Sequence, residues 1–338
     1  MRKENTMVEN LELISAETLL LTPLEHKKDL VEGLITDGLT IISGSQKVGK
    51  SWMALQLCIC VANGEPFLDL PTEQGDVLYL SLEDPPRRIQ ERLFRAADEV
   101  KSHLYFATHS LTLNTGLTYQ IRQHLDMHPQ TRLVVIDTLQ KVRLGGGESS
   151  YASDYEDLSK IKEIADEKHV AIVLVHHVRK EKADDPHEMV SGTTGITGCA
   201  DSSFVICVKD RLSDTATLSC TGRDIEVQDI EIRFTPDLKW EFVSRKSRQD
   251  LAEAAAPEFM TRLADFVLEK GGWSGTSTEL IAQLEIEDIK PNVLSKYVNQ
   301  FHSTFLKSRG IEYQFKRTAS SRVLTFSICD DSDGNDDK

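Results

Sequence analysis

Eight consecutive residues have the types and the spacing that phosphate binding needs. Residues 44–51 read GSQKVGKS, a G-x-x-x-x-G-K-S pattern between an apolar run and a helical pattern. The glycines allow a tight loop whose backbone N–H groups converge on phosphate oxygens, and the helix start adds partial positive charge. The lysine can reach the β- and γ-phosphates, and the serine hydroxyl can ligate Mg²⁺. The pattern predicts that ATP and Mg²⁺ bind to Gly44, Ser45, Gln46, Lys47, Val48, Gly49, Lys50 and Ser51.

Two later apolar runs end in side chains that can complete such a site. Leu133–Asp137 is followed in the chain by Ala171–His176, which leads directly into His177. Because parallel strands deliver their carboxyl ends to one crevice, we expect Asp137 to hold Mg²⁺ there. One histidine of the pair can sense the γ-phosphate. The alternative is that both histidines have no ligand role, because a His-His pair without a third spaced ligand is a poor metal site.

A third run, Val77–Ser81, is followed by two acids, Glu83 and Asp84. A carboxylate beside the γ-phosphate can orient and deprotonate the attacking water. The alternative is that both acids favour the start of the helix that Pro85 begins. These residues alone leave the two interpretations open.

The elements that position these residues alternate between two hydrophobic periods. From Leu30 to about residue 243, short apolar runs alternate with patterns of period 3.6, which is typical of a mostly parallel α/β sheet that finishes with antiparallel strands. Ser153 and Glu156 predict a capping box at the start of a helix. The expected strands are 39–43, 77–81, 104–107, 133–137, 171–176, 204–208, 215–221 and 229–235, and the expected helices are 50–62, 85–100 and 153–168.

The series GSQKVGKS, VLYLSLEDPP, LVVIDTLQKV, VLVHHVRK, SGTTGITGCAD and CTGRD resembles the RecA-type P-loop ATPases of the RepA-like hexameric helicase family, relatives of DnaB-type helicases carried by plasmids, phages and other mobile elements. The resemblance covers residues 25–243. It implies a catalytic role for Glu83, a metal-binding role for Ser51 and Asp137, and a sensor role for His177. It also implies a homohexameric ring with single-stranded DNA in its pore, met by loops within 145–155 and 183–199. The basic finger that a neighbouring subunit supplies would be Arg211 or Arg223, with Lys209 ranked behind them.

A second unit follows a polar, Ala-rich linker. Helical patterns over 259–270, 276–284 and 291–308 precede two alternating runs, 311–317 and 322–328, which predicts a winged helix. Residues 290–329 hold seven Lys or Arg against one Glu, a net charge of +6 in a chain of −15. We therefore expect duplex DNA to contact this unit through Lys296, Lys316, Arg317 and Arg322; the alternative is packing on the ring or on an acidic protein. The expected division is an N-terminal extension 1–24, an ATPase domain 25–243, a linker 244–258, a winged helix 259–329 and an acidic tail 330–338.

Composition narrows the class of protein. The hydrophobic fraction of 40% and the charged fraction of 28% are typical of a globular chain, and the strong net acidity excludes a protein that coats nucleic acid through bulk positive charge. No apolar run approaches the ~20 residues that span a bilayer, and no secretory signal is visible, so we expect a cytoplasmic protein without membrane contact. The six cysteines form no C-x-x-C pair, which favours reduced thiols.

The leading functional prediction is a ring-forming, DNA-dependent ATPase, a replicative helicase of a plasmid, phage or mobile element. Two alternatives remain. The first is an ATP-dependent helicase loader or scaffold switch that unwinds nothing, and the second is a recombinase-like filament protein. The segment 183–199 bears on this choice, because it contains no Lys or Arg and carries Asp184, Asp185 and Glu188.

Overall fold

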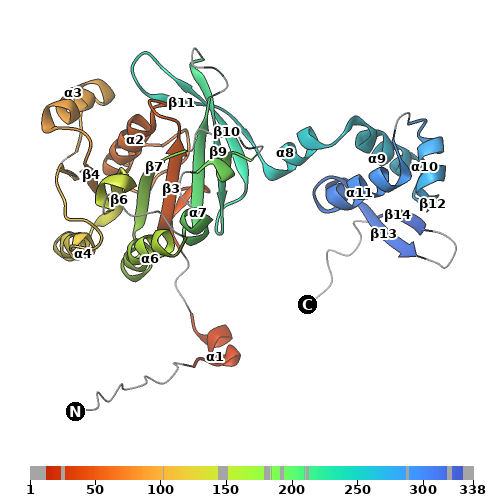
Figure 1. Cartoon of the computed structure of the whole chain (residues 1–338), viewed down its shortest axis with the longest axis horizontal. Helices are drawn as coiled ribbons and strands as arrows, with labels where there is room; N and C mark the ends of the chain where they lie inside the picture. Colours follow the sequence, from red (N-terminus) through yellow and green to blue (C-terminus); the bar gives the residue numbers. More distant parts are fainter. Residues whose placement is uncertain are drawn as a thin grey trace, which may run out of the picture.

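The computed structural model describes residues 13–23, 27–101, 103–143, 151–178, 183, 185–190, 194–208, 210, 213–286, 289–317 and 322–329. Its largest element is a nine-stranded sheet in the order β11-β10-β9-β8-β3-β7-β6-β4-β5 (Figure 1). The strands from β8 to β5 are parallel, and β9, β10 and β11 are antiparallel. Their bounds are β3 Gly38–Gly44, β4 Asp76–Ser81, β5 Leu104–Ala107, β6 Thr131–Asp137, β7 Ala171–His177, β8 Ser202–Cys207, β9 Thr215–Gly222, β10 Gln228–Phe234 and β11 Trp240–Lys246.

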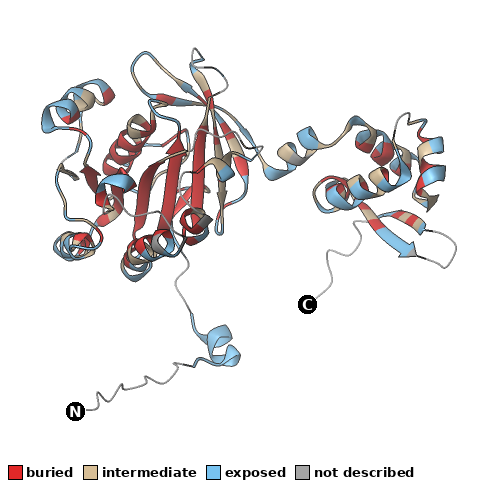
Figure 2. Ribbon diagram, viewed as in Figure 1, coloured by how far each residue is buried: buried red, intermediate tan, exposed pale blue. Residues whose placement is uncertain are grey.

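Helices cover both faces of this sheet, which is why its central strands are buried along almost their whole length (Figure 2). Alternate residues of each strand point to opposite faces and so divide the core into two clusters. One cluster packs against α2 Lys50–Asn63 and the end of α3 Pro86–Ala96. The other packs against α4 Leu117–Met127, α5 Leu139–Val142, α6 Tyr151–Lys168 and α7 Thr194–Cys199.

The predicted mostly parallel sheet with antiparallel strands at its end is confirmed. Three details of the prediction are wrong. The patterns did not indicate α4 or β11, and β11 continues into the segment expected to begin a linker at residue 244. The helix α3 ends at Ala96 rather than near residue 100. Ser153 lies inside α6, which already includes Tyr151, so it does not begin that helix.

Two small elements precede the sheet. The helix α1 Ala16–Leu21 buries none of its residues, and its side-chain cap comes from Ser15. A short antiparallel pair, β1 Asp29–Val31 and β2 Ile35–Thr36, then leads into β3. Among the described residues, no helix has the length and apolarity that crossing a membrane requires.

The C-terminal residues form a second cluster of helices and strands, which α8 Arg248–Ala255 joins to the sheet (Figure 1). A three-stranded sheet in the order β12-β14-β13 packs on three helices. The Thr276–Glu279 capping box is present, whereas the helix expected over 291–308 changes after Phe301 into a π-helical turn and a 3₁₀ turn. The bounds are α9 Glu258–Lys270, β12 Trp273–Thr276, α10 Ser277–Gln283, α11 Pro291–Phe301, η2 His302–Leu306, η3 Lys307–Arg309, β13 Ile311–Arg317 and β14 Arg322–Ile328. The assignment of this unit as a winged helix stays a prediction.

Candidate nucleotide-binding site

The loop between β3 and α2 has the backbone shape of an anion-binding nest. Lys47 and Gly49 have positive φ angles of 65° and 97°, which turn successive N–H groups toward one side. Gly44 is required because a Cβ there would lie 2.9 Å from Cγ1 of Val48. Within the described part of the chain, no backbone oxygen accepts a hydrogen bond from the N–H groups of residues 46–50. The loop therefore offers unused donors at a helix start, which fits phosphate.

The side chain of Lys50 lies across this loop. Its ammonium donates hydrogen bonds to the carbonyl oxygens of Gly44, at 2.9 Å, and Ser45, at 2.8 Å. Burial lowers the pKa of Lys50 to about 8, although the carboxylates of Asp137 and Glu83 act in the opposite direction. The ammonium is thus a poorly hydrated charge, held by two carbonyls, that an incoming phosphate can attract.

At the end of β6, the buried carboxylate of Asp137 lies close to the phosphate loop. The phenol of Tyr79 donates a hydrogen bond of 2.8 Å to its Oδ2, whereas its Oδ1 is buried without a partner among the described residues. Burial raises the pKa of Asp137, against the hydroxyls of Ser51 and Tyr79, which act to lower it. A buried carboxylate oxygen without a partner, next to a serine hydroxyl, fits the hard oxygen ligands that Mg²⁺ prefers.

The two acids that follow β4 have different surroundings. Asp84 is buried and forms ion pairs with Arg88, at 3.0 Å, and with Arg92. Glu83 is exposed and accepts a hydrogen bond of 3.1 Å from the hydroxyl of Thr138, the residue after Asp137. The helix α3 begins after Pro85 without any side-chain cap. The structure therefore places Glu83 toward the phosphate site and gives it no capping role.

His177 ends β7 beside Gly44 of β3. Burial and the neighbouring Lys50 ammonium lower the pKa of His177, so its ring is neutral at neutral pH. Its Nδ1 is buried and has no hydrogen-bond partner in the described part of the structure. A neutral ring with a free nitrogen suits a polar sensor. The parallel register also brings His177 to the carboxyl ends of the strands, where the phosphate loop, Glu83 and Asp137 lie.

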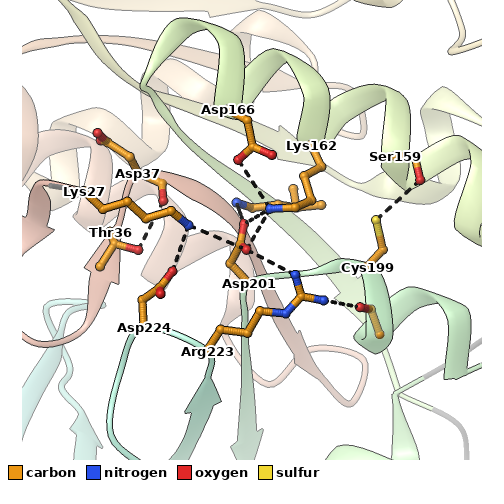
Figure 3. Close-up of polar contacts among 12 residues, drawn as sticks. Lys27, Thr36, Asp37, Ser159, Lys162, Asp166, Cys199, Asp201, Arg223 and Asp224 are labelled. Atoms are coloured by element: carbon orange, nitrogen blue, oxygen red, sulfur yellow. Dashed lines mark hydrogen bonds and ion pairs between the residues drawn. The ribbon is translucent and has the colours of Figure 1, made fainter. Parts of the chain in front are cut away.

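Arg223 lies away from these residues, at the edge of the sheet where β8 begins (Figure 3). Its guanidinium donates to the carbonyl of Gly198, at 2.8 Å, and lies 3.7 Å from the carboxylate of Asp201. Asp201 also binds Lys162, at 2.6 Å, and the backbone N–H of Leu39. Arg223 is itself exposed and belongs to an ion cluster around the buried Asp201, which also lines an open pocket of about 530 Å³. The other finger candidates, Lys209 and Arg211, lie outside the described residues.

The expected DNA contacts of the C-terminal unit are on its surface where the structure describes them. Lys296 on α11 is exposed, as are Lys316 and Arg322 at facing ends of β13 and β14. The side chain of Arg317 lies outside the described residues. The neighbouring Ser295 shares a hydrogen bond of 2.8 Å with Ser277 of α10.

The two loops expected to face a ring pore are described only in part. Residues 151–155 of the first form the opening turn of α6 and so are not loop, and residues 144–150 lie outside the described chain. The second segment contains η1 Pro186–Met189 and α7, with residues 184 and 191–193 outside the description.

Sequence reasoning missed two residues of the site, Tyr79 and Thr138. Tyr79 lies in the middle of β4, directly between the apolar residues Leu78 and Leu80. A buried tyrosine hydroxyl needs a hydrogen-bond partner, so this position carried a usable signal. Thr138 carried none, because its contact with Glu83 depends on β4 and β6 being neighbours in the sheet.

Comparison with known proteins agrees with this geometry. A family model described as AAA domain matches residues 8–183. DNA repair protein RadA of Streptococcus pyogenes serotype M6 is 26% identical over 161 residues, which cover 46% of this chain and 31% of RadA. The chain therefore spans about a third of the length of the curated relatives it matches.

Two solved structures are similar in fold. The first, an isolated ATPase domain, is 14% identical, with a TM-score of 0.51, over 62% of this chain and 85% of that one. The second, a DnaB-like replicative helicase solved with a view to its interactions with primase, is 16% identical, with a TM-score of 0.49, over 61% and 58%. The first likeness shows the fold, and the predicted RecA-type P-loop core is confirmed.

Proposed function

The chain belongs to the AAA domain family, and from that premise we propose that it is a ring-forming, DNA-dependent ATPase that acts as a replicative helicase of a plasmid, phage or mobile element. One observation carries the proposal. The loop 44–51, Glu83, Asp137 and His177 follow or end four parallel strands and lie together at the carboxyl ends of these strands, and all belong to the motifs through which the chain resembles the RepA-like family.

In this proposal each side chain has one task in ATP hydrolysis. The backbone donors of the loop and the Lys50 ammonium bind the phosphates. Ser51 and Asp137 would hold Mg²⁺, which would supply positive charge to neutralise the phosphates. Glu83 accepts a proton from the attacking water, and Thr138 orients its carboxylate. His177 donates or accepts a hydrogen bond near the γ-phosphate.

We assign the finger to Arg211 in preference to Arg223. Arg223 is already bound to Asp201 and Gly198, so reaching a neighbour's phosphate would require these contacts to break. Arg211 follows β8, and Ile206 of β8 pairs with Gly44 at the edge of the phosphate loop. Arg211 therefore follows, in the chain, a strand that ends beside the phosphate loop, and this makes it better suited than Arg223 to act between adjacent subunits.

Subunit mixing tests the ring. Lys50→Ala and Arg211→Ala proteins should each hydrolyse little ATP alone, and a mixture should regain activity at interfaces that join an intact loop to an intact finger. A finger contributes about 10³–10⁵ in rate, so the recovery is measurable. Arg223→Ala is the matched control and should retain activity without a partner. If every mixture stays inactive and the wild-type protein is monomeric in the presence of ATP, the proposed ring is contradicted.

Strand displacement tests the helicase activity itself. Forked DNA with one labelled strand should be unwound by the wild type in the presence of ATP and Mg²⁺, and not by the Glu83→Gln protein. Hydrolysis without any displacement would instead favour the second candidate function, a helicase loader or scaffold switch. A specific observation supports that candidate, because the segment 183–199 carries acidic residues and no Lys or Arg.

A further inference from the structure

Trp240, at the start of the outermost strand β11, reaches across the fold to the phosphate loop. Its indole N–H donates a hydrogen bond of 3.2 Å to the carbonyl oxygen of Gly49. The ring also lies against the α-carbon, because a Cβ on Gly49 would be 2.8 Å from Cζ2 of Trp240. This indole is 3% exposed, and none of the sequence patterns pointed to it.

The bond fixes the direction of a neighbouring donor. The carbonyl of Gly49 and the N–H of Lys50 belong to one planar trans peptide, in which the two groups point in opposite directions. That carbonyl accepts from Trp240 and also from the N–H of Met53, at 3.0 Å. Because the oxygen is held by these two donors, the Lys50 N–H points away from the indole of Trp240 and stays available to an anion.

Trp240 is itself held in place by α2. The side-chain amide of Gln56 accepts from the backbone N–H of Trp240 and donates to its backbone carbonyl, both at 2.8 Å. Phe234 of β10 packs against the indole, with ring centroids 4.8 Å apart. Since Gln56 and Gly49 flank the first turns of α2, the strand and the loop are fixed to one rigid helix.

We propose that Trp240 is a positioning residue for the phosphate cradle, which it preorganises by holding the Gly49–Lys50 peptide. The inference rests on the proposed nucleotide site and extends it to a strand that carries none of its recognised motifs. Preorganised donors bind more tightly because less ordering remains to be done on binding. Loss of the indole N–H should therefore weaken phosphate binding while leaving the fold intact.

The test is ADP affinity in the full-length protein, measured by titration calorimetry. Trp240→Phe keeps the ring packing and deletes the donor, so its Kd for ADP should rise about 3- to 10-fold, the usual scale for one neutral hydrogen bond. Trp273→Phe is the matched control, because Trp273 packs on Phe266 and Phe326 in the C-terminal unit. The ADP-induced rise in Tm should shrink in Trp240→Phe and not in the control.

Each outcome decides the inference. An unchanged Kd in Trp240→Phe, or an equal rise in Trp273→Phe, would overturn it. If Trp240→Phe fails to fold, Gln56→Met removes the two bonds to the Trp240 backbone and should raise the Kd in the same direction; an unchanged Kd there would overturn the inference as well. If the wild-type protein does not bind ADP, the proposed nucleotide site is wrong and the role of Trp240 falls with it. Failure of the nucleotide site can therefore be told apart from failure of the Trp240 role alone.

Discussion

Two adjacent acids, Glu83 and Asp84, have opposite roles in the structure. Asp84 is buried and neutralised by Arg88 and Arg92, and it fixes the start of α3. Glu83 has no ion pair in the described chain and contacts Thr138 beside the buried Asp137. Of these two acids, Glu83 is therefore the one whose carboxylate carries no ion pair within the described residues.

This division predicts different consequences for two isosteric substitutions. Glu83→Gln should bind ATP like the wild type and hydrolyse it at least ~100-fold more slowly, because it removes the general base and leaves the phosphate loop intact. Asp84→Asn is the control, and it should lower Tm with little loss of turnover. Single-turnover hydrolysis and denaturation curves measure both. Near-normal turnover in Glu83→Gln would remove Glu83 from the chemistry.

The pKa of about 8 that burial gives Lys50 predicts a pH dependence for nucleotide binding. Phosphate prefers the charged lysine and raises its pKa when bound. Affinity for ADP should therefore be highest below pH 8 and fall as the pH rises through 8, by up to about tenfold per pH unit. His177 does not interfere, because its lowered pKa keeps it neutral in this range. Calorimetry between pH 7 and 9 measures the effect, and Lys50→Met should bind weakly with a flat profile. A flat wild-type profile would contradict the prediction.

At the scale of elements, a buried carboxylate joins segments that are distant in the chain. Asp201, just before β8, accepts from Lys162 of α6 and from the N–H of Leu39 in β3, and lies 3.7 Å from Lys27 (Figure 3). A Cβ on Gly38 would be 2.6 Å from its Oδ2, so this strand start must be glycine. Burial acts to raise the pKa of Asp201, but the N–H of Leu39 and the Lys162 ammonium hold it below its usual value.

Asp201→Asn should therefore destabilise the fold by about 3 kcal/mol, the lower end of the range for removing one partner of a buried ion pair, because the partners of Asp201 are partly exposed. Since the folded pKa is lowered, the stabilisation is present above the usual aspartate pKa of 3.8 and is lost as the pH falls through the folded value. Asp224→Asn, which removes only an exposed partner of Lys27, should cost less than about 1 kcal/mol. Urea denaturation at pH 7 compares the two variants, and the difference in stability between the wild type and Asp201→Asn should shrink as the pH is lowered below 3.8. Equal losses in both variants would contradict the role given to Asp201.

The elements of the site could be predicted where local pattern decides them. The strands that end at Asp137 and His177 contain continuous apolar runs, LVVI and AIVLV, so their positions and their parallel arrangement followed from these runs and the rules for parallel sheets. β11 could not be found, because its residues alternate weakly and it is held by Gln56 from α2. The commitment of Arg223 to Asp201 was equally invisible, since it depends on β9 returning antiparallel beside β8.

At the scale of the whole molecule, charge is divided between two parts. Residues 290–329 carry +6 in a chain of −15, and the described basic groups expected to meet DNA are exposed. Binding of duplex DNA by the full-length protein should weaken steeply with salt, with a slope of about −0.9 per phosphate contacted. The triple substitution of Lys316, Arg317 and Arg322 by Ala should flatten that slope. Lys307→Ala is the control, because Lys307 pairs with Glu312.

Fluorescence anisotropy over a salt series measures both slopes. Binding that the triple substitution leaves unchanged would favour a protein partner for this unit.

The central claim is that ATP hydrolysis at the 44–51 loop is coupled to DNA. The most direct test is the steady-state ATPase rate of the full-length protein at saturating ATP and Mg²⁺, with and without single-stranded DNA. We predict a several-fold rise with single-stranded DNA, abolished by Glu83→Gln. A wild-type rate that is measurable yet identical with and without DNA would contradict the claim.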